Sequence, residues 1–214
     1  MMQLYSFFAS GTSYRLRIAL NLKGLDYTYI PVDLRTEEHL RADFKDINPQ
    51  GLVPALVAGD VTLTQSPAIM EWLEERHPQP PLLPVDPDAR ARVRALAAIV
   101  GCDIHPLNNR RVLVYLREVF ASDEASINAW CGRWISDGFA ALERMIGQDS
   151  KREGFCFGSH PTLADVYLIP QIAGSRRFRV DLSPYPALLE IERHCQALPA
   201  FANAAPKHQP DYVA

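Results

Sequence analysis

The segment Ser10–Ser13, with the sequence Ser-Gly-Thr-Ser, places three hydroxyl groups within four residues. It follows the apolar run Leu4–Phe8, which we expect to be a strand. It precedes residues 16–22, whose apolar side chains have the spacing of a buried helical face. A helix start carries unpaired N–H groups and a partial positive charge, so it suits an anion. No cysteine lies nearby, and the hydroxyls therefore suit a thiolate brought in by a ligand. The simpler alternative is that Ser13 only caps the helix.

Two further segments offer complementary groups. Val53 and Pro54 stand just before an expected strand, and a cis proline there would leave the Val53 backbone free to pair with an extended peptide. A trans proline that merely opens the strand is the alternative. Gln65-Ser66-Pro67 begins an expected helix and suits a carboxylate, unless Ser66 is a plain N-cap. A thiolate site, a peptide-pairing edge and a carboxylate site together describe a receptor for glutathione.

The elements that must position these groups alternate over residues 1–82. The pattern predicts the order β-α-β-α-β-β-α, in which the first two strands lie parallel and the last two form a hairpin. Besides the elements above, the expected segments are a strand over Tyr27–Val32, a helical stretch over Glu37–Asp46, a strand over Val61–Leu63 and a helix from Ser66, as N-cap, to about Arg76.

The rest of the chain is helical in pattern after a proline-rich linker. His77–Pro87 contains five prolines. Beyond it we expect helices over Ala89–Val119 with an interruption at Pro106, over Glu124–Ile146, from a capping box at Thr162–Asp165 to about Phe178, and a last helical pair after residue 186. We therefore expect an α/β domain over residues 1–82, a linker over 83–89 and an all-helical domain over 90–214.

Composition excludes several classes of protein. The 214 residues are 48% hydrophobic and 22% charged, and a net charge of −3 argues against nonspecific nucleic-acid binding. We expect no transmembrane segment and no signal peptide, because no apolar run is long enough and the first residues do not open one. The four scattered cysteines lack metal-ligand spacing, so we expect no metal site and a reducing, cytoplasmic location.

The chain resembles the zeta class of the glutathione transferases along nearly its whole length. The segments that carry this resemblance are residues 10–15, 48–56, 65–69, 162–165 and 177–186. The segment Gly101–Arg111 is similar to bacterial isomerases of this class that act on maleylpyruvate in the gentisate pathway, relatives of maleylacetoacetate isomerase. The resemblance implies a thioredoxin-like α/β N-terminal domain followed by an all-α C-terminal domain, which is the glutathione transferase fold.

The resemblance also implies a set of glutathione-binding residues. Three of them face the sulfur, one pairs with the cysteinyl backbone, two hold the γ-glutamyl end and one reaches the glycyl carboxylate. In that order they are Ser10, Gly11 and Thr12; Val53; Gln65 and Ser66; and His39. His105 and Asn109, four apart on one helical face, would close over the tripeptide from the second domain. On their own, His39 could be a solvated histidine and His105 an interhelical hydrogen bonder.

Arginines are the candidates for binding a small dicarboxylate, since each guanidinium can bind one carboxylate bidentately. The family match favours Arg177, followed by Arg111 and Arg110, whereas Arg176 is expected to face solvent. Ser10, Thr12, Arg111 and Arg177 are thus the candidate catalytic residues, with Arg110 also counted among the glutathione-binding residues. Ala9 departs from the resemblance, because relatives often carry an arginine there.

The implied activity is glutathione-dependent isomerisation of maleylpyruvate to fumarylpyruvate. A thiolate can add to the cis double bond, allow rotation and leave, so glutathione would be a cofactor that is not consumed. Hydrogen bonds from Ser10 or Thr12 would lower the thiol pKa, and arginine would stabilise the developing negative charge. The alternatives are maleylacetoacetate as substrate, a transferase acting on α-halo acids, and a non-catalytic protein of this fold. The resemblance further implies a homodimer.

Overall fold

The computed structural model describes residues 1–149 and 152–213. Two compact units make up the chain: Met1–Pro81 together with Ala197–Ala214, and Leu82–Gln196. The sequence pattern places residues 197–214 in the helical domain, whereas in the structure this segment packs with the first unit.

A four-stranded sheet forms the centre of the first unit, in the order β2-β1-β3-β4. Its strands are β1 (Met2–Ser6), β2 (Tyr27–Pro31), β3 (Ala55–Ala58) and β4 (Val61–Thr64). β1 pairs parallel with β2 and antiparallel with β3, and β3 and β4 form the predicted hairpin. Leu4 and Leu56 face each other in the β1–β3 register and are fully buried. The expected element order of this unit is confirmed.

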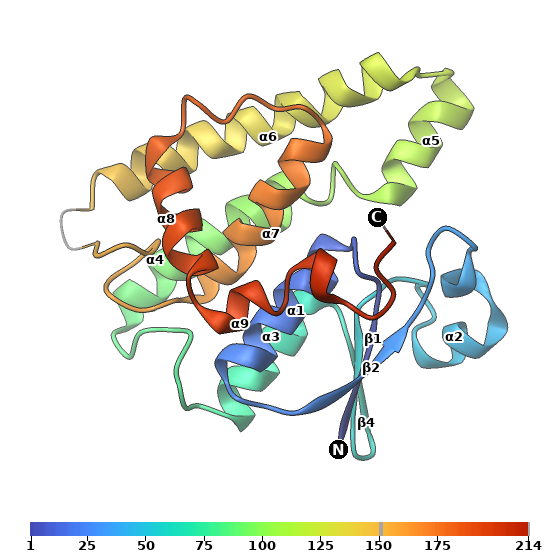
Figure 1. Cartoon of the computed structure of the whole chain (residues 1–214), viewed down its shortest axis with the longest axis horizontal. Coiled ribbons are helices and arrows are strands. Elements are labelled where there is room, and N and C mark those ends of the chain that lie inside the picture. The colour runs from blue at the N-terminus through green and yellow to red at the C-terminus, as the bar shows by residue number, and fades with distance from the viewer. Residues whose placement is uncertain (150–151, 214) are drawn as a thin grey trace. The chain divides into compact units, whose positions relative to one another are not determined.

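Helices cover both faces of this sheet. In Figure 1, α1 (Gly11–Leu22) and α3 (Ser66–Arg76) lie together on one side of the strands, and α2 (Ala42–Ile47) lies on the other. The helix expected over residues 37–46 is interrupted: a 3₁₀ turn, η1 (Glu38–Leu40), is separated from α2 by Arg41, whose backbone is extended. α3 begins one residue earlier than predicted, so that Gln65 rather than Ser66 is its N-cap.

The C-terminal segment completes the first unit. It contains α9 (Pro199–Ala202) and a 3₁₀ turn, η3 (Pro206–His208). Arg17 of α1 is fully buried, and its Nε donates to the Ala204 carbonyl at 2.9 Å. Asn21 of α1 similarly donates to the Ala200 carbonyl at 3.0 Å. A buried donor such as Arg17 requires an acceptor, and these two bonds hold the C-terminal segment against α1.

The second unit contains helices joined by turns and no strand among its described residues. It consists of α4 (Pro87–Ala98), a π-helical turn η2 (Ile99–Ile104), α5 (Arg110–Phe120), α6 (Glu124–Gly147), α7 (Leu163–Arg177) and α8 (Pro186–Gln196). The capping box predicted at the start of α7 is present, with Asp165 accepting bonds from the Thr162 N–H and hydroxyl at 2.7 and 2.9 Å. The predicted α/β and all-α classes are both confirmed. No helix in the described ranges is long and apolar enough to cross a bilayer.

Candidate active site

The hydroxyl segment forms a hydrogen-bonded chain at the start of α1. Ser10 is the N-cap, with an extended backbone (φ −73°, ψ 121°), and its Oγ accepts the Ser13 N–H at 3.2 Å. Ser10 Oγ and Thr12 Oγ1 lie 2.9 Å apart, and Thr12 Oγ1 donates to the Val53 carbonyl at 3.0 Å. The alternative in which Ser13 caps the helix is therefore wrong, because Ser10 has that role.

Counting protons assigns the direction of each bond. A carbonyl oxygen only accepts, and a hydroxyl has one proton to donate. The proton of Thr12 is therefore engaged with Val53, and Ser10 is the donor in the bond between the two hydroxyls. Ser10 can redirect its proton by giving up that single bond, whereas Thr12 would have to break its link to Val53. Of the two candidate thiolate donors, Ser10 is the one free to turn.

Val53 precedes a cis proline and lies in a buried apolar cluster. The Val53–Pro54 bond is cis, which decides between the two alternatives that the sequence left open. The Val53 side chain packs with Phe7, Val32 and Phe44. Its carbonyl oxygen accepts from Thr12 but has a second lone pair. This backbone group can therefore still accept a bond from an extended peptide.

Gln65 and Ser66 open α3 in an unusual conformation. Gln65 has a positive φ of 66°, a region that a residue with a side chain adopts only where its surroundings enforce it. The Gln65 amide donates to the side-chain oxygen of Gln50. Ser66, the first residue of α3, is buried. The start of α3 thus presents a hydroxyl together with a helix N-terminus, which suits a carboxylate.

His39 lies next to the turn that leads to Val53. Gly51 has φ +62°, and a Cβ there would come within 2.8 Å of the His39 carbonyl oxygen. The turn is closed by Asn48, whose Nδ2 donates to the Leu52 carbonyl at 2.6 Å. His39 is buried rather than a solvated surface residue. Gly51 was not among the predicted site residues, although a glycine after Asn-Pro-Gln is a typical signal for such a turn.

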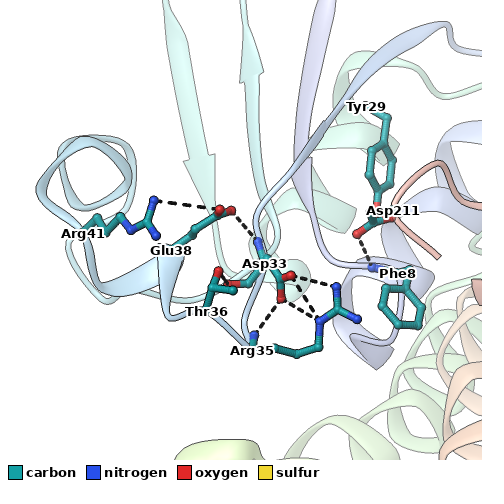
Figure 2. A network of polar contacts seen from close by, with 8 residues as sticks. All are labelled: Phe8, Tyr29, Asp33, Arg35, Thr36, Glu38, Arg41 and Asp211. Atoms are coloured by element: carbon teal, nitrogen blue, oxygen red, sulfur yellow. Dashed lines mark hydrogen bonds and ion pairs between the residues drawn. The ribbon is translucent and has the colours of Figure 1, made fainter. Parts of the chain in front are cut away.

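A polar network fixes the segment that carries His39 (Figure 2). The Glu38 carboxylate accepts the Asp33 N–H at 2.7 Å, and the Asp33 carboxylate accepts from Arg35 Nη2 at 2.7 Å and from Arg35 Nε at 2.9 Å. Hydrogen bonds from Arg35 are the main cause that lowers the pKa of Asp33 to about 2. The network stabilises the loop between β2 and α2.

His105 and Asn109 do not lie on one helix, so the prediction of a shared helical face is wrong. Residues 105–109 form a turn between η2 and α5. Asn109 is the N-cap of α5, and its Oδ1 accepts the Arg111 N–H at 3.1 Å. This bond uses the side-chain oxygen of Asn109 and not its amide N–H groups. Arg110 and Arg111 are both exposed. The capping preference of asparagine and the proline at 106 explain the interruption.

The two neighbouring arginines at the end of α7 differ in their surroundings. Arg176 is exposed, as expected, and forms a bidentate ion pair with Glu192 at 2.6 Å. Arg177 is also exposed, and its guanidinium lies 6.0 Å from the centre of the Phe178 ring. No carboxylate in the described part of the chain forms an ion pair with Arg177. Arg177 therefore keeps its charge available for a ligand.

Three of the four cysteines are buried, and Cys102 is exposed. Burial raises the pKa of the Cys131 thiol to about 11, and it raises the pKa of Cys156 and Cys195 well above the usual range. Among the described residues there is no group of three or more His, Cys, Asp or Glu side chains that could hold a metal ion.

Comparison with known proteins gives a consistent result. Two family models match the chain: the glutathione S-transferase N-terminal domain over residues 9–76 and the glutathione S-transferase C-terminal domain over residues 125–199. Maleylpyruvate isomerase from Ralstonia sp. is 61% identical over 210 residues, covering 98% of this chain and 99% of that protein.

Two solved structures are also similar. One is a holo structure of maleylpyruvate isomerase, described as a bacterial glutathione S-transferase of the zeta class, with a TM-score of 0.98, 61% identity and coverage of 99% and 100% of the two chains. The other is maleylacetoacetate isomerase from Methylobacterium extorquens with bound malonate and glutathione, with a TM-score of 0.95, 39% identity and the same coverage.

Proposed function

The chain belongs to the zeta class of the glutathione S-transferases, and on that premise we propose that it is a glutathione-dependent isomerase that converts maleylpyruvate to fumarylpyruvate. The observation that supports this most is the chain of bonds Ser10–Thr12–Val53 at the start of α1. In this chain of bonds, the Ser10 hydroxyl can rotate to donate its proton to a ligand, and the Val53 backbone can pair with an extended peptide.

The residues present fit glutathione as the cofactor. When bound, glutathione supplies a thiolate that adds reversibly to an activated double bond. Ser10 holds that sulfur in its charged form by donating the proton it otherwise gives to Thr12. Thr12, anchored on Val53, keeps the start of α1 in place. The N-terminus of α3, with Ser66 and Gln65, binds the γ-glutamyl carboxylate, and His39 binds the glycyl end.

The helical unit supplies the charge for the dicarboxylate. We assign Arg177 to a substrate carboxylate, because it is exposed and has no ion-pair partner among the described residues. Arg111, exposed in the first turn of α5, is the second candidate. A guanidinium beside the keto group also stabilises the negative charge that develops on it. Arg110, His105 and Asn109 are assigned to glutathione.

The proposal extends to the setting of the enzyme. It places the reaction in gentisate-type aromatic catabolism in the cytoplasm, carried out by a homodimer. Residues 1–82, with the C-terminal segment that packs on them, provide the glutathione-binding domain, and the helical unit that follows the linker 83–89 provides the substrate-binding domain. Maleylacetoacetate is the second candidate substrate, because the Methylobacterium relative is named for it. Relatives often carry an arginine at the position of Ala9, and the loss of this positive charge affects the choice between the two substrates.

A steady-state assay tests the proposal. The wild-type protein is given maleylpyruvate or maleylacetoacetate, each with and without glutathione, and kcat/KM is compared. We expect glutathione-dependent loss of maleylpyruvate absorbance at the higher kcat/KM. A higher value for maleylacetoacetate would favour the second substrate. The absence of any glutathione-dependent change with either substrate would overturn the assignment.

A further inference from the structure

A tight turn connects β1 to the catalytic hydroxyl. The Ser10 N–H donates to the Phe7 carbonyl at 3.0 Å, which closes a turn over Phe8 and Ala9. The Phe7 N–H in turn points to Ser13 Oγ at 3.5 Å. The position of Ser10 therefore depends on how the peptide groups of Phe7 and Phe8 are held.

Arg17 holds the carbonyl side of this turn. Its Nη2 donates to the Phe8 carbonyl at 3.0 Å and its Nη1 to the Phe7 carbonyl at 3.4 Å. The same guanidinium donates from Nε to Ala204 in the C-terminal segment. The turn and the C-terminal segment thus share one buried cation.

Asp211 holds the N–H side of the same turn. Its Oδ2 accepts the Phe8 N–H at 3.0 Å, and its Oδ1 accepts the Tyr29 hydroxyl at 2.7 Å. Figure 2 shows this carboxylate reaching Phe8 from the C-terminal segment. Tyr212 adds an edge-to-face contact with the Phe8 ring, with centroids 5.5 Å apart and planes at 89°. Both polar groups of the Phe8 residue are therefore held by charged side chains.

We propose that Asp211 is a positioning residue for Ser10. By accepting the Phe8 N–H, its carboxylate sets the orientation of the peptide plane that leads into the Phe7–Ser10 turn, and so it sets where the Ser10 hydroxyl meets the glutathione sulfur. Asp211 and Phe8 are 203 residues apart in the chain. The inference rests on the proposed function, because it concerns the same thiolate site.

The loss of the Asp211 charge and the loss of its hydrogen bond to Phe8 should shift the pKa of the bound glutathione thiol in opposite directions. This difference makes the proposal testable. Asp211 lies within electrostatic range of Arg17 and Arg35. Removing its negative charge alone leaves the surroundings more positive and lowers the pKa of a bound thiol. Losing the bond to Phe8 displaces Ser10 and raises that pKa. The variant Asp211→Asn removes the charge but keeps an oxygen acceptor, whereas Asp211→Ala removes both.

The experiment measures the pKa of the glutathione thiol bound to each variant, from its thiolate absorbance, together with kcat and the Kd for glutathione. We expect Asp211→Ala to raise the bound-thiol pKa by about one unit and to lower kcat about tenfold. The Kd should change little, because most of the proposed glutathione contacts lie elsewhere. Asp211→Asn should restore the wild-type kcat and show no rise in pKa.

The control variant is Asn21→Ala, which removes a bond between the C-terminal segment and the end of α1 opposite to Ser10. We expect it to lower the melting temperature without moving the thiol pKa. If Asp211→Ala behaves like Asn21→Ala, or if Asp211→Asn raises the pKa as much as Asp211→Ala, the proposal is overturned. A wild-type protein that binds no glutathione would instead overturn the proposed function itself.

Discussion

The Thr12 hydroxyl donates to the Val53 carbonyl across 3.0 Å, and it thereby joins the start of α1 to the residue before the cis proline. Because this bond engages the only proton of Thr12, Ser10 must donate within the hydroxyl pair. The two hydroxyls therefore differ: Thr12 fixes the start of α1 to Val53, whereas the Ser10 hydroxyl can rotate toward a ligand.

Substitution of the two hydroxyls should separate these roles. We expect Ser10→Ala to lower kcat/KM about 10²- to 10³-fold, as loss of a donor to a developing or stabilised anion does. Thr12→Val should lower it only about tenfold, because it weakens an anchor. Thr28→Val removes an exposed hydroxyl of the same unit and should have no effect. Equal losses for Ser10→Ala and Thr12→Val would contradict the assignment of the donor.

The adjacent arginines at the end of α7 provide a matched pair. Arg177→Ala should raise the KM for the dicarboxylate about ten- to a hundredfold, because a bidentate charged contact is lost. Arg176→Ala removes the same charge one residue away, but from a side chain already paired with Glu192. It should leave KM within about twofold. A larger effect at Arg176 than at Arg177 would show that the substrate-binding arginine has been misassigned.

Gly51 and Gly59 have nearly the same φ, so their alanine variants distinguish the effect of backbone strain from the effect of a steric clash near the glutathione site. Gly59 has φ +63° and open space where a Cβ would lie, so Gly59→Ala should lower the free energy of unfolding by only about 1 kcal/mol. Gly51→Ala adds a clash with the His39 carbonyl at 2.8 Å. It should lower the free energy of unfolding further and also weaken glutathione binding. Calorimetric titration with glutathione checks this, and equal affinity for the two variants would refute it.

The carboxyl group of Asp33 should titrate at an unusually low pH. Its pKa in the folded protein is about 2, below the ordinary value of 3.8, mainly because of hydrogen bonds from Arg35. Folding is therefore favoured by this group above about pH 4, and that contribution is lost as the pH falls toward 2. Arg35→Ala should return the midpoint toward 3.8, as seen by carboxyl-carbon NMR. Arg41→Ala, whose contact with Glu38 is exposed and 3.9 Å long, should leave it unchanged.

Much of this architecture follows from local sequence patterns. Alternating apolar runs, the turn before Val61 and the capping box at Thr162 predict the element order and both fold classes correctly. The errors lie where a local pattern competes with another interaction. The helix expected over Glu37–Asp46 breaks at Arg41, and the helical face expected for His105 and Asn109 is lost because Asn109 caps α5.

The site itself was only partly predictable from sequence. The hydroxyl segment and Gln65-Ser66 are recognisable by residue type, because helix N-termini have a known chemistry. The bond between Asp211 and the Phe8 N–H spans almost the whole chain. Nothing in the residues near either partner indicates it, since only the packing of the C-terminal segment against α1 brings the two together.

Proton NMR of a reaction mixture tests the proposed activity most directly, because it follows the double-bond geometry and the amount of glutathione at the same time. With wild-type protein, maleylpyruvate and a small amount of glutathione, we expect complete conversion of the cis signal to that of the trans isomer while the glutathione signal stays constant. Consumption of glutathione in step with the substrate, or a cis signal that persists, would contradict the assignment as an isomerase.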